Sequence, residues 1–292
     1  MLAVWIAAAF ALGLLARQLG LPPLIGFLGA GFLLNAAGIE RVPLLEDAAH
    51  MGVLLLLFSV GLKLRLRNLI RAEVWGVALL QFAVALLVVA VAMGAGVGAS
   101  LPVVLVLASA LSFSSTVLAA KILEERREIR AFHGRVAIGI LIVQDVIAVA
   151  LLGVNDGRAL TWAAALALLL PLAQPLVRRL LDLAGHGELL ILLGSALALG
   201  VGGYGFEAIG LSGELGALLI GMLLANHAKA VELSDSLWSL KEFFLVGFFL
   251  SIGLTGLPTW HTLGLAALPI AILPLKVLLY FLLLLAFGLS AR

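Results

Sequence analysis

Ile142-Val143-Gln144-Asp145-Val146-Ile147 is the stretch that decides the fold, because it places a carboxylate inside a long apolar run. A helix needs about 20 consecutive apolar residues to cross a bilayer, and residues 133–153 supply them. A charge near the middle of such a helix costs several kcal/mol unless it is paired, hydrated or protonated, so it marks a candidate functional site. One other charged residue, Lys276, lies at comparable depth, in the apolar run 262–289. The rest of the sequence has to account for one acid and one base near the midpoints of two helices.

The composition predicts an all-α polytopic membrane protein. The chain has 292 residues, of which 64% are hydrophobic and 12% charged, with a mean hydropathy of +1.24. Soluble domains carry about twice that charged fraction. Because cysteine is absent, a disulfide framework and a cysteine nucleophile are excluded. The net charge of +2 comes without a basic stripe, so the expected partner is the lipid bilayer and not a nucleic acid. No cofactor or metal is expected.

The apolar runs divide the chain into about eleven predicted membrane segments, joined by short connections rich in proline, glycine or charge. These segments are 2–16, 24–39, 48–62, 73–93, 101–122, 133–153, 159–177, 187–206, 212–227, 238–256 and 262–289. The whole of residues 1–292 is therefore expected to form one transmembrane domain.

The lysines and arginines predict how these segments are oriented. Of the 18, fifteen lie in the odd-numbered connections and the C-terminal tail, two lie in the even-numbered connections (Arg41 and Arg158), and Lys276 lies inside a segment. Positive residues accumulate on the cytoplasmic side of a membrane. We therefore expect the odd-numbered loops in the cytoplasm and the N-terminus outside.

Two short stretches recur along the chain at nearly the same offset. Residues 26–34 and 216–224 share the pattern G-x-L-x-x-G-x-L-L, and residues 58–62 resemble residues 250–254, at offsets of 190 and 192. The predicted orientations of the two copies are opposite, which is typical of the inverted repeats of secondary transporters. Two glycine-rich helices with common small-residue packing are the alternative. The first repeat would cover about 24–153. The second would start near 212 and be incomplete at 292, so that this chain would be a fragment lacking counterparts of 101–122 and 133–153.

Asp145 is the first candidate site residue. It lies near the middle of 133–153, where a carboxylate can bind either a proton or a dehydrated monovalent cation. A neutral buried acid, or an acid paired to lock helices together, is the structural alternative. Its neighbour Gln144 could lend its amide to a cation or orient Asp145.

The second candidate is a hydroxyl-rich stretch in the middle of 101–122 that includes Ser114, Ser115 and Thr116. Such hydroxyls can satisfy backbone groups where a membrane helix bends or unwinds. A broken helix offers its half-helix ends and free carbonyls to ions. Plain small-residue packing explains the same composition.

The third candidate is Lys276, which lies too far from either helix end to reach water easily. It needs a partner, and Asp145 is the carboxylate predicted at the same depth. Lys276 is therefore expected to pair with Asp145, either as part of an ion site or as a purely structural link.

These residues together resemble the monovalent cation:proton antiporters, and specifically their Kef-type potassium/proton branch. The stretches that carry the resemblance are Ser114-Ser115-Thr116, Gln144-Asp145, residues 56–62, residues 248–254 and Lys276. The resemblance implies the inverted-repeat fold of the sodium/proton exchangers. About eleven of its roughly thirteen helices would be present here, and a second broken helix and the last helix would be missing.

The resemblance also implies roles and partners. Asp145 would carry the ion and the proton, Gln144 would replace the second acid of electrogenic relatives, and Lys276 would pair with the acidic site. The protein would be a homodimer in a bacterial inner membrane, with a cytosolic nucleotide-binding regulatory domain or an ancillary subunit as a further partner.

The sequence therefore predicts an antiporter that exchanges K⁺ or Na⁺ for H⁺ by alternating access, with Asp145 carrying either ion. A ligand-gated potassium efflux channel and an inactive truncated fragment are the alternatives. An enzyme is not expected. An intramembrane aspartyl protease, for example, needs two membrane aspartates, and Asp145 alone qualifies.

Overall fold

The computed structural model describes residues 2–39, 41–64, 71–97, 101–155, 169–257 and 259–288, and the regular structure in these ranges is helical. Contacts divide the chain into two compact units. The first unit consists of Met1–Lys63 and Leu166–Thr259, and the second of Leu64–Ala165 and Trp260–Arg292. Each unit therefore combines two stretches that are far apart along the sequence.

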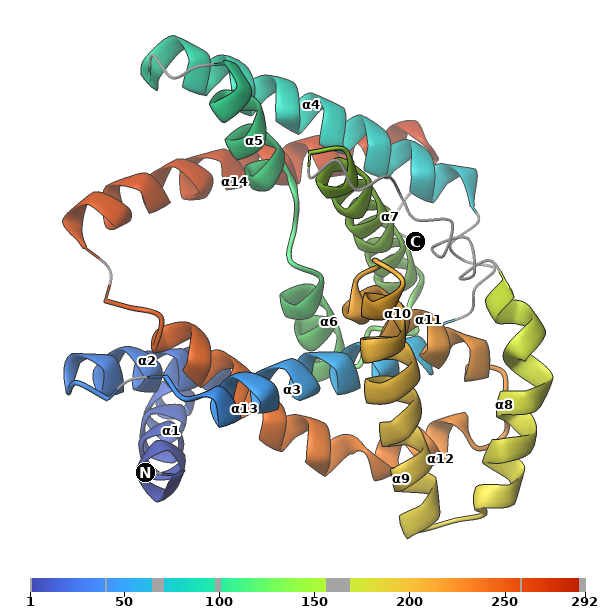
Figure 1. Ribbon diagram of the computed structural model, residues 1–292. Coiled ribbons are helices and arrows are strands. Elements are labelled where there is room, and N and C mark those ends of the chain that lie inside the picture. The colour runs from blue at the N-terminus through green and yellow to red at the C-terminus, as the bar shows by residue number, and fades with distance from the viewer. Residues whose placement is uncertain are drawn as a thin grey trace. The chain divides into compact units, whose positions relative to one another are not determined.

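Helix α3 (Pro43–Gly61) belongs to the first unit, and most of its residues are buried. The other helices of this unit are α1 (Leu2–Gln18), α2 (Pro23–Ala36), α8 (Leu170–Ala184), α9 (Glu188–Ser195), the π-helix η3 (Ala196–Tyr204), α10 (Gly205–Ala208), α11 (Gly213–Leu224), α12 (Ala230–Ser236) and α13 (Trp238–Gly253). The second unit contains α4 (Ala72–Val97), α5 (Leu101–Ser112), α6 (Thr116–Glu125), α7 (Phe132–Asn155) and α14 (Trp260–Ala286) (Figure 1).

Most of the predicted segments coincide with helices. The predicted segment 159–177 lies largely outside the described residues, and α8 begins at Leu170 and continues past residue 177 through Arg178 and Arg179 to Ala184. The short helix α12 was not predicted, because four of its seven residues are charged or polar. The predicted total of eleven membrane segments is not confirmed.

Several described helices are long and apolar enough to cross a membrane. Four qualify by length and composition: Pro43–Gly61, Ala72–Val91, Val103–Glu125 and Glu188–Ala208. A fifth is obtained if α12 and α13, which meet at a bend of 50°, are counted as one span. Shorter apolar helices, such as Pro23–Ala36 and Gly213–Leu224, accompany them. The chain is thus an integral membrane protein.

Two close helix contacts in the first unit are made through glycine. Gly31 of α2 lies on Gly253 of α13, and Gly61 of α3 lies on Gly221 of α11. At each of the four, an added Cβ would overlap a main-chain oxygen of the facing helix. Small residues let membrane helices approach this closely. The two contacts are equivalent under the sequence offsets, because Gly31 corresponds to Gly221 and Gly61 to Gly253.

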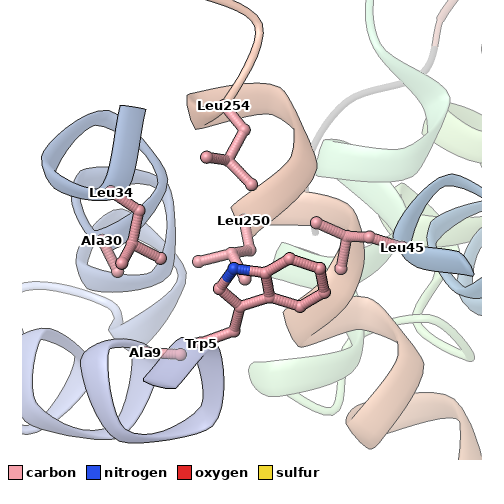
Figure 2. Close-up of a cluster of buried hydrophobic side chains, with 7 residues drawn as sticks. All are labelled: Trp5, Ala9, Ala30, Leu34, Leu45, Leu250 and Leu254. Atoms are coloured by element: carbon pink, nitrogen blue, oxygen red, sulfur yellow. The ribbon is translucent and has the colours of Figure 1, made fainter. Parts of the chain in front are cut away.

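A cluster of buried apolar side chains joins four helices of the first unit (Figure 2). Its centre is Trp5 of α1, which packs with Leu45 of α3 and Leu250 of α13, and its other members are Ala9, Ala30, Leu34 and Leu254. In the second unit, a corresponding cluster joins α4 to α7 and includes Val77, Ile140 and Val143. It fixes the α7 segment that carries Gln144 and Asp145.

The turn after α8 is held by the segment that precedes α12. The Nζ atom of Lys229 donates to the carbonyl oxygens of Leu181, Asp182 and Gly185 at 3.2, 3.3 and 2.9 Å. A lysine at the C-terminus of a helix satisfies free carbonyls and complements the helix dipole. Two histidine–carboxylate pairs join the same segments, His227–Asp182 at 3.3 Å and His186–Glu232 at 2.6 Å. Hydrogen bonds and ion pairs therefore join residues 181–186 to residues 227–232.

Candidate functional site

The apolar run 101–125 is broken at its middle in the second unit. Helix α5 ends at Ser112, α6 begins at Thr116, and residues 113–115 between them are not helical. Hydroxyls complete both ends: Ser112 donates to the carbonyl of Ala108 at 2.7 Å, and Ser115 is the N-cap of α6, accepting from the N–H of Leu118 at 3.3 Å. The hydroxyl-rich stretch thus interrupts the helix. Ser115 serves as a cap at this interruption.

The N-terminal end of α6 faces the two polar residues of α7. Thr116, the first residue of α6, donates its hydroxyl to the carboxylate of Asp145, with distances of 3.2 Å to Oδ1 and 3.0 Å to Oδ2. The main-chain N–H of Ser114 donates to Oε1 of Gln144 at 3.1 Å. The structure therefore brings together Ser114, Thr116, Gln144 and Asp145, four of the predicted site residues.

The C-terminal end of α5 faces Lys276 of α14. Its Nζ atom lies 3.3, 3.2 and 2.9 Å from the carbonyl oxygens of Leu111, Ser112 and Phe113, and 3.5 Å from Oγ of Ser114. The expected pairing of Lys276 with Asp145 stays a prediction. The contacts seen here place the ammonium of Lys276 on the end of α5. The physical reason is that free carbonyls at a helix C-terminus attract a cation, which sequence separation does not reveal.

The charges of Lys276 and Asp145 are opposite in sign to the partial charges of the two helix ends that they contact. The C-terminus of a helix carries a partial negative charge and the N-terminus a partial positive charge. The cation Lys276 lies at the C-terminus of α5, and the carboxylate of Asp145 lies at the N-terminus of α6. Acid and base thus stabilise one interruption from its two polar ends.

Two polar residues at the site, Gln81 and Tyr280, were not predicted from the sequence. Gln144 donates through Nε2 to Oε1 of Gln81 on α4 and to the hydroxyl of Tyr280 on α14, the latter at 2.9 Å. The ring of Phe113 packs on that of Phe82, with centroids 4.9 Å apart. Gln81 could have been found from sequence, because it is an amide isolated within the apolar segment 73–93. Tyr280 follows Lys276 by four residues and so shares its helix face.

A cavity of about 370 Å³ lies beside the interruption, within the second unit. Ser114 and Tyr280 line it together with apolar side chains of α7, and Phe132 and His133 line it at the start of α7. In the part of the chain that is described, no group of three metal-ligating side chains comes together.

We expect Lys276→Met to destabilise the protein, because the three carbonyl oxygens at the end of α5 would lose their charged donor. Leaving a buried acceptor unpaired costs about 1–3 kcal/mol. Lys276→Arg keeps the charge and should retain most of the stability. Thermal unfolding of the purified protein in detergent, followed by tryptophan fluorescence, measures both variants. Equal melting temperatures for wild type and Lys276→Met would show that the carbonyl contacts contribute nothing.

Known proteins are similar to this chain over most of its length. The family model described as "Sodium/hydrogen exchanger, transmembrane" matches residues 6–292. YbaL of Escherichia coli strain K12 is 32% identical over 275 residues, which make up 84% of this chain and 49% of YbaL. The glutathione-regulated potassium-efflux system protein KefC of Klebsiella pneumoniae strain 342 is 30% identical over 304 residues, with 96% of this chain and 49% of KefC covered.

A plant protein is also similar to this chain. The chloroplastic K(+) efflux antiporter 1 of Arabidopsis thaliana is 27% identical over 268 residues, which cover 80% of this chain and 22% of that protein. The chain spans about half the length of the two bacterial relatives. The predicted resemblance to Kef-type cation:proton antiporters is confirmed by these matches. The chain belongs to the transmembrane sodium/hydrogen exchanger family.

Proposed function

We propose that this protein exchanges a monovalent cation, K⁺ or Na⁺, for a proton by alternating access, with Asp145 as the group that carries either ion. The observation that carries the proposal is the carboxylate of Asp145 at the N-terminus of the interrupted helix, held by the hydroxyl of Thr116. Interrupted helices near the midplane are the ion sites of secondary transporters. The names of the relatives, potassium-efflux system protein and K(+) efflux antiporter, support potassium as the cation.

The ligands of the cation would be the carboxylate of Asp145 and the hydroxyls of Thr116 and Ser114. The cavity beside Ser114 supports access from the side on which α7 begins, because it extends to His133. One carboxylate that takes up either a proton or a monovalent cation exchanges equal charges. The transport would therefore be electroneutral.

The orientation, repeats and partners also remain proposals. Odd-numbered loops in the cytoplasm are supported by the contact between residues 182–187 and 227–232, two connections that the charge bias assigns to the same side. The inverted repeat is supported by the equivalent pairs Gly31–Gly253 and Gly61–Gly221. By the family resemblance we propose a homodimer in a bacterial inner membrane, with a cytosolic nucleotide-binding domain or an ancillary subunit as regulator.

The experiment that tests the function is dequenching of a pH-sensitive dye in acid-loaded everted vesicles on addition of K⁺ or Na⁺. We expect saturable dequenching that depends on the cation and persists when the membrane potential is clamped. Single-channel currents in planar bilayers would contradict exchange and indicate a channel. Dequenching by neither cation, with protein shown to be in the vesicles, would contradict the proposal altogether.

A further inference from the structure

The amide of Gln144 is fixed in one orientation by its surroundings. The main-chain N–H of Ser114 can only donate, so the Gln144 atom that it meets must be the oxygen Oε1. The nitrogen Nε2 then faces Gln81 and Tyr280, and its two hydrogens match two acceptors, Oε1 of Gln81 and the Tyr280 hydroxyl. If the amide were reversed, the NH₂ group of Gln144 would face the N–H of Ser114, and two donors would meet without an acceptor. The direction of this hydrogen-bond chain is therefore determined by the backbone.

Both glutamines are fully buried, so these bonds cannot be exchanged for bonds to water. The side chains of Gln81 and Gln144 have no exposed surface. In a membrane interior, a buried amide hydrogen that loses its acceptor finds no substitute. Gln81 takes part through one atom: its Oε1 accepts from Gln144, whereas its Nε2 is buried and has no hydrogen-bond partner within the described structure. Gln81 therefore contributes to this hydrogen-bond chain through its acceptor oxygen.

The chain of bonds ends on the backbone of the interruption. Gln144 holds the N–H of Ser114, which lies two residues before Thr116, the residue that contacts Asp145. A shift of the backbone at Ser114 would move the Thr116 hydroxyl with respect to the carboxylate. Displacements of about 1 Å at a reacting group can change rates about 100-fold. Residues that fix the Gln144 amide would therefore also fix the ion site.

We propose that Gln81 and Tyr280 are positioning residues for ion exchange, acting through Gln144 on the backbone of the interruption. This inference rests on the proposed function. It assigns Gln144 the role of a structural link, with its amide hydrogens already used, and leaves direct ion contact to Asp145, Thr116 and Ser114. It also explains why α14 supplies two contacts to one site. Lys276 donates to the carbonyl oxygens at the end of α5, and Tyr280 accepts from Gln144, which in turn accepts from the N–H of Ser114.

The test measures the cation concentration that gives half-maximal dequenching in everted vesicles, a quantity that does not depend on the amount of protein. Gln81→Leu and Tyr280→Phe each remove one acceptor, and we expect each to raise this concentration about tenfold, the effect of one lost buried hydrogen bond. Tyr204→Phe, at the chain's other tyrosine, and Gln18→Leu are matched controls at exposed positions and should have no effect.

A double-mutant comparison separates positioning from general stability. If Gln81 acts through Gln144, Gln81→Leu should add nothing in a Gln144→Leu background. Additive effects of the two substitutions, or an unchanged half-maximal concentration in Gln81→Leu, would each overturn the inference. Wild-type exchange that is lost in Asp145→Asn but normal in Gln81→Leu would overturn this inference alone. An absence of exchange in the wild type would overturn it together with the proposed function.

Discussion

Asp145→Asn is expected to reduce cation-driven dequenching to the level of vesicles that lack the protein. Asparagine keeps the shape of aspartate and can still accept the hydrogen bond from Thr116. It has no ionisable group, so it can neither release a proton nor offer a negative charge to a cation. The variant should therefore fold and reach the membrane but fail to exchange ions at any pH. The expected loss is complete, because one carboxylate is proposed to serve both ions.

Two further variants show whether this loss belongs to the site. Asp182→Asn changes an exposed aspartate of α8 in the other unit and should leave exchange intact. Asp145→Glu restores a carboxylate on a longer side chain and should recover measurable exchange with an altered cation dependence. Exchange that survives in Asp145→Asn at wild-type rates would move the proton-carrying group elsewhere and leave Asp145 as a structural residue.

Gly31→Val is expected to cause a large loss of stability in the first unit. Even a single Cβ at Gly31 would lie 2.7 Å from Cα of Gly253 and would overlap the carbonyl oxygen of Leu250. These are main-chain atoms, which cannot rotate aside as a side chain can. Overpacking of a close contact costs about 1–3 kcal/mol, and occasionally more, so a cost of about 3 kcal/mol or more is expected here.

The matched control lies two residues away on the same helix. A Cβ at Gly29 would have Leu12 as its nearest neighbour, at 4.0 Å, so Gly29→Val should be tolerated. Gly61→Val should behave like Gly31→Val, because Gly61 faces Gly221 in the equivalent contact. Thermal unfolding in detergent and the monodisperse fraction on size exclusion measure all three. Equal stabilities for Gly31→Val and Gly29→Val would show that the helices can separate without cost.

Much of the architecture could be predicted from the apolar runs, because a bilayer requires long stretches of apolar helix with few alternatives. The sequence could also indicate that residues 112–116 are an unusual place in a helix, since four hydroxyls gather there. It could not indicate that Lys276 would bind carbonyl oxygens, because main-chain acceptors exist at every residue and become available only where a helix ends. Similarly, Gln81 stands out in sequence only as an isolated amide, and Gln81 and Tyr280 gain a role through the position of the Gln144 amide. The extension of α8 was missed because its Arg178 and Arg179 resemble a loop.

The placement of Lys276 and Asp145 at the two half-helix ends has a consequence for the formal charge of the site during a transport cycle. With a proton on Asp145, the site carries the single positive charge of Lys276. With a potassium or sodium ion on the ionised carboxylate, the three charges again sum to one positive charge. Moving one elementary charge across a membrane potential of 100 mV changes the free energy by about 2.3 kcal/mol. This change is the same for the proton-loaded and the cation-loaded site, because both carry the same charge. The direction of net exchange would then depend only on the concentration ratios of the two ions across the membrane. At any voltage, exchange would stop when the cation and the proton have the same ratio.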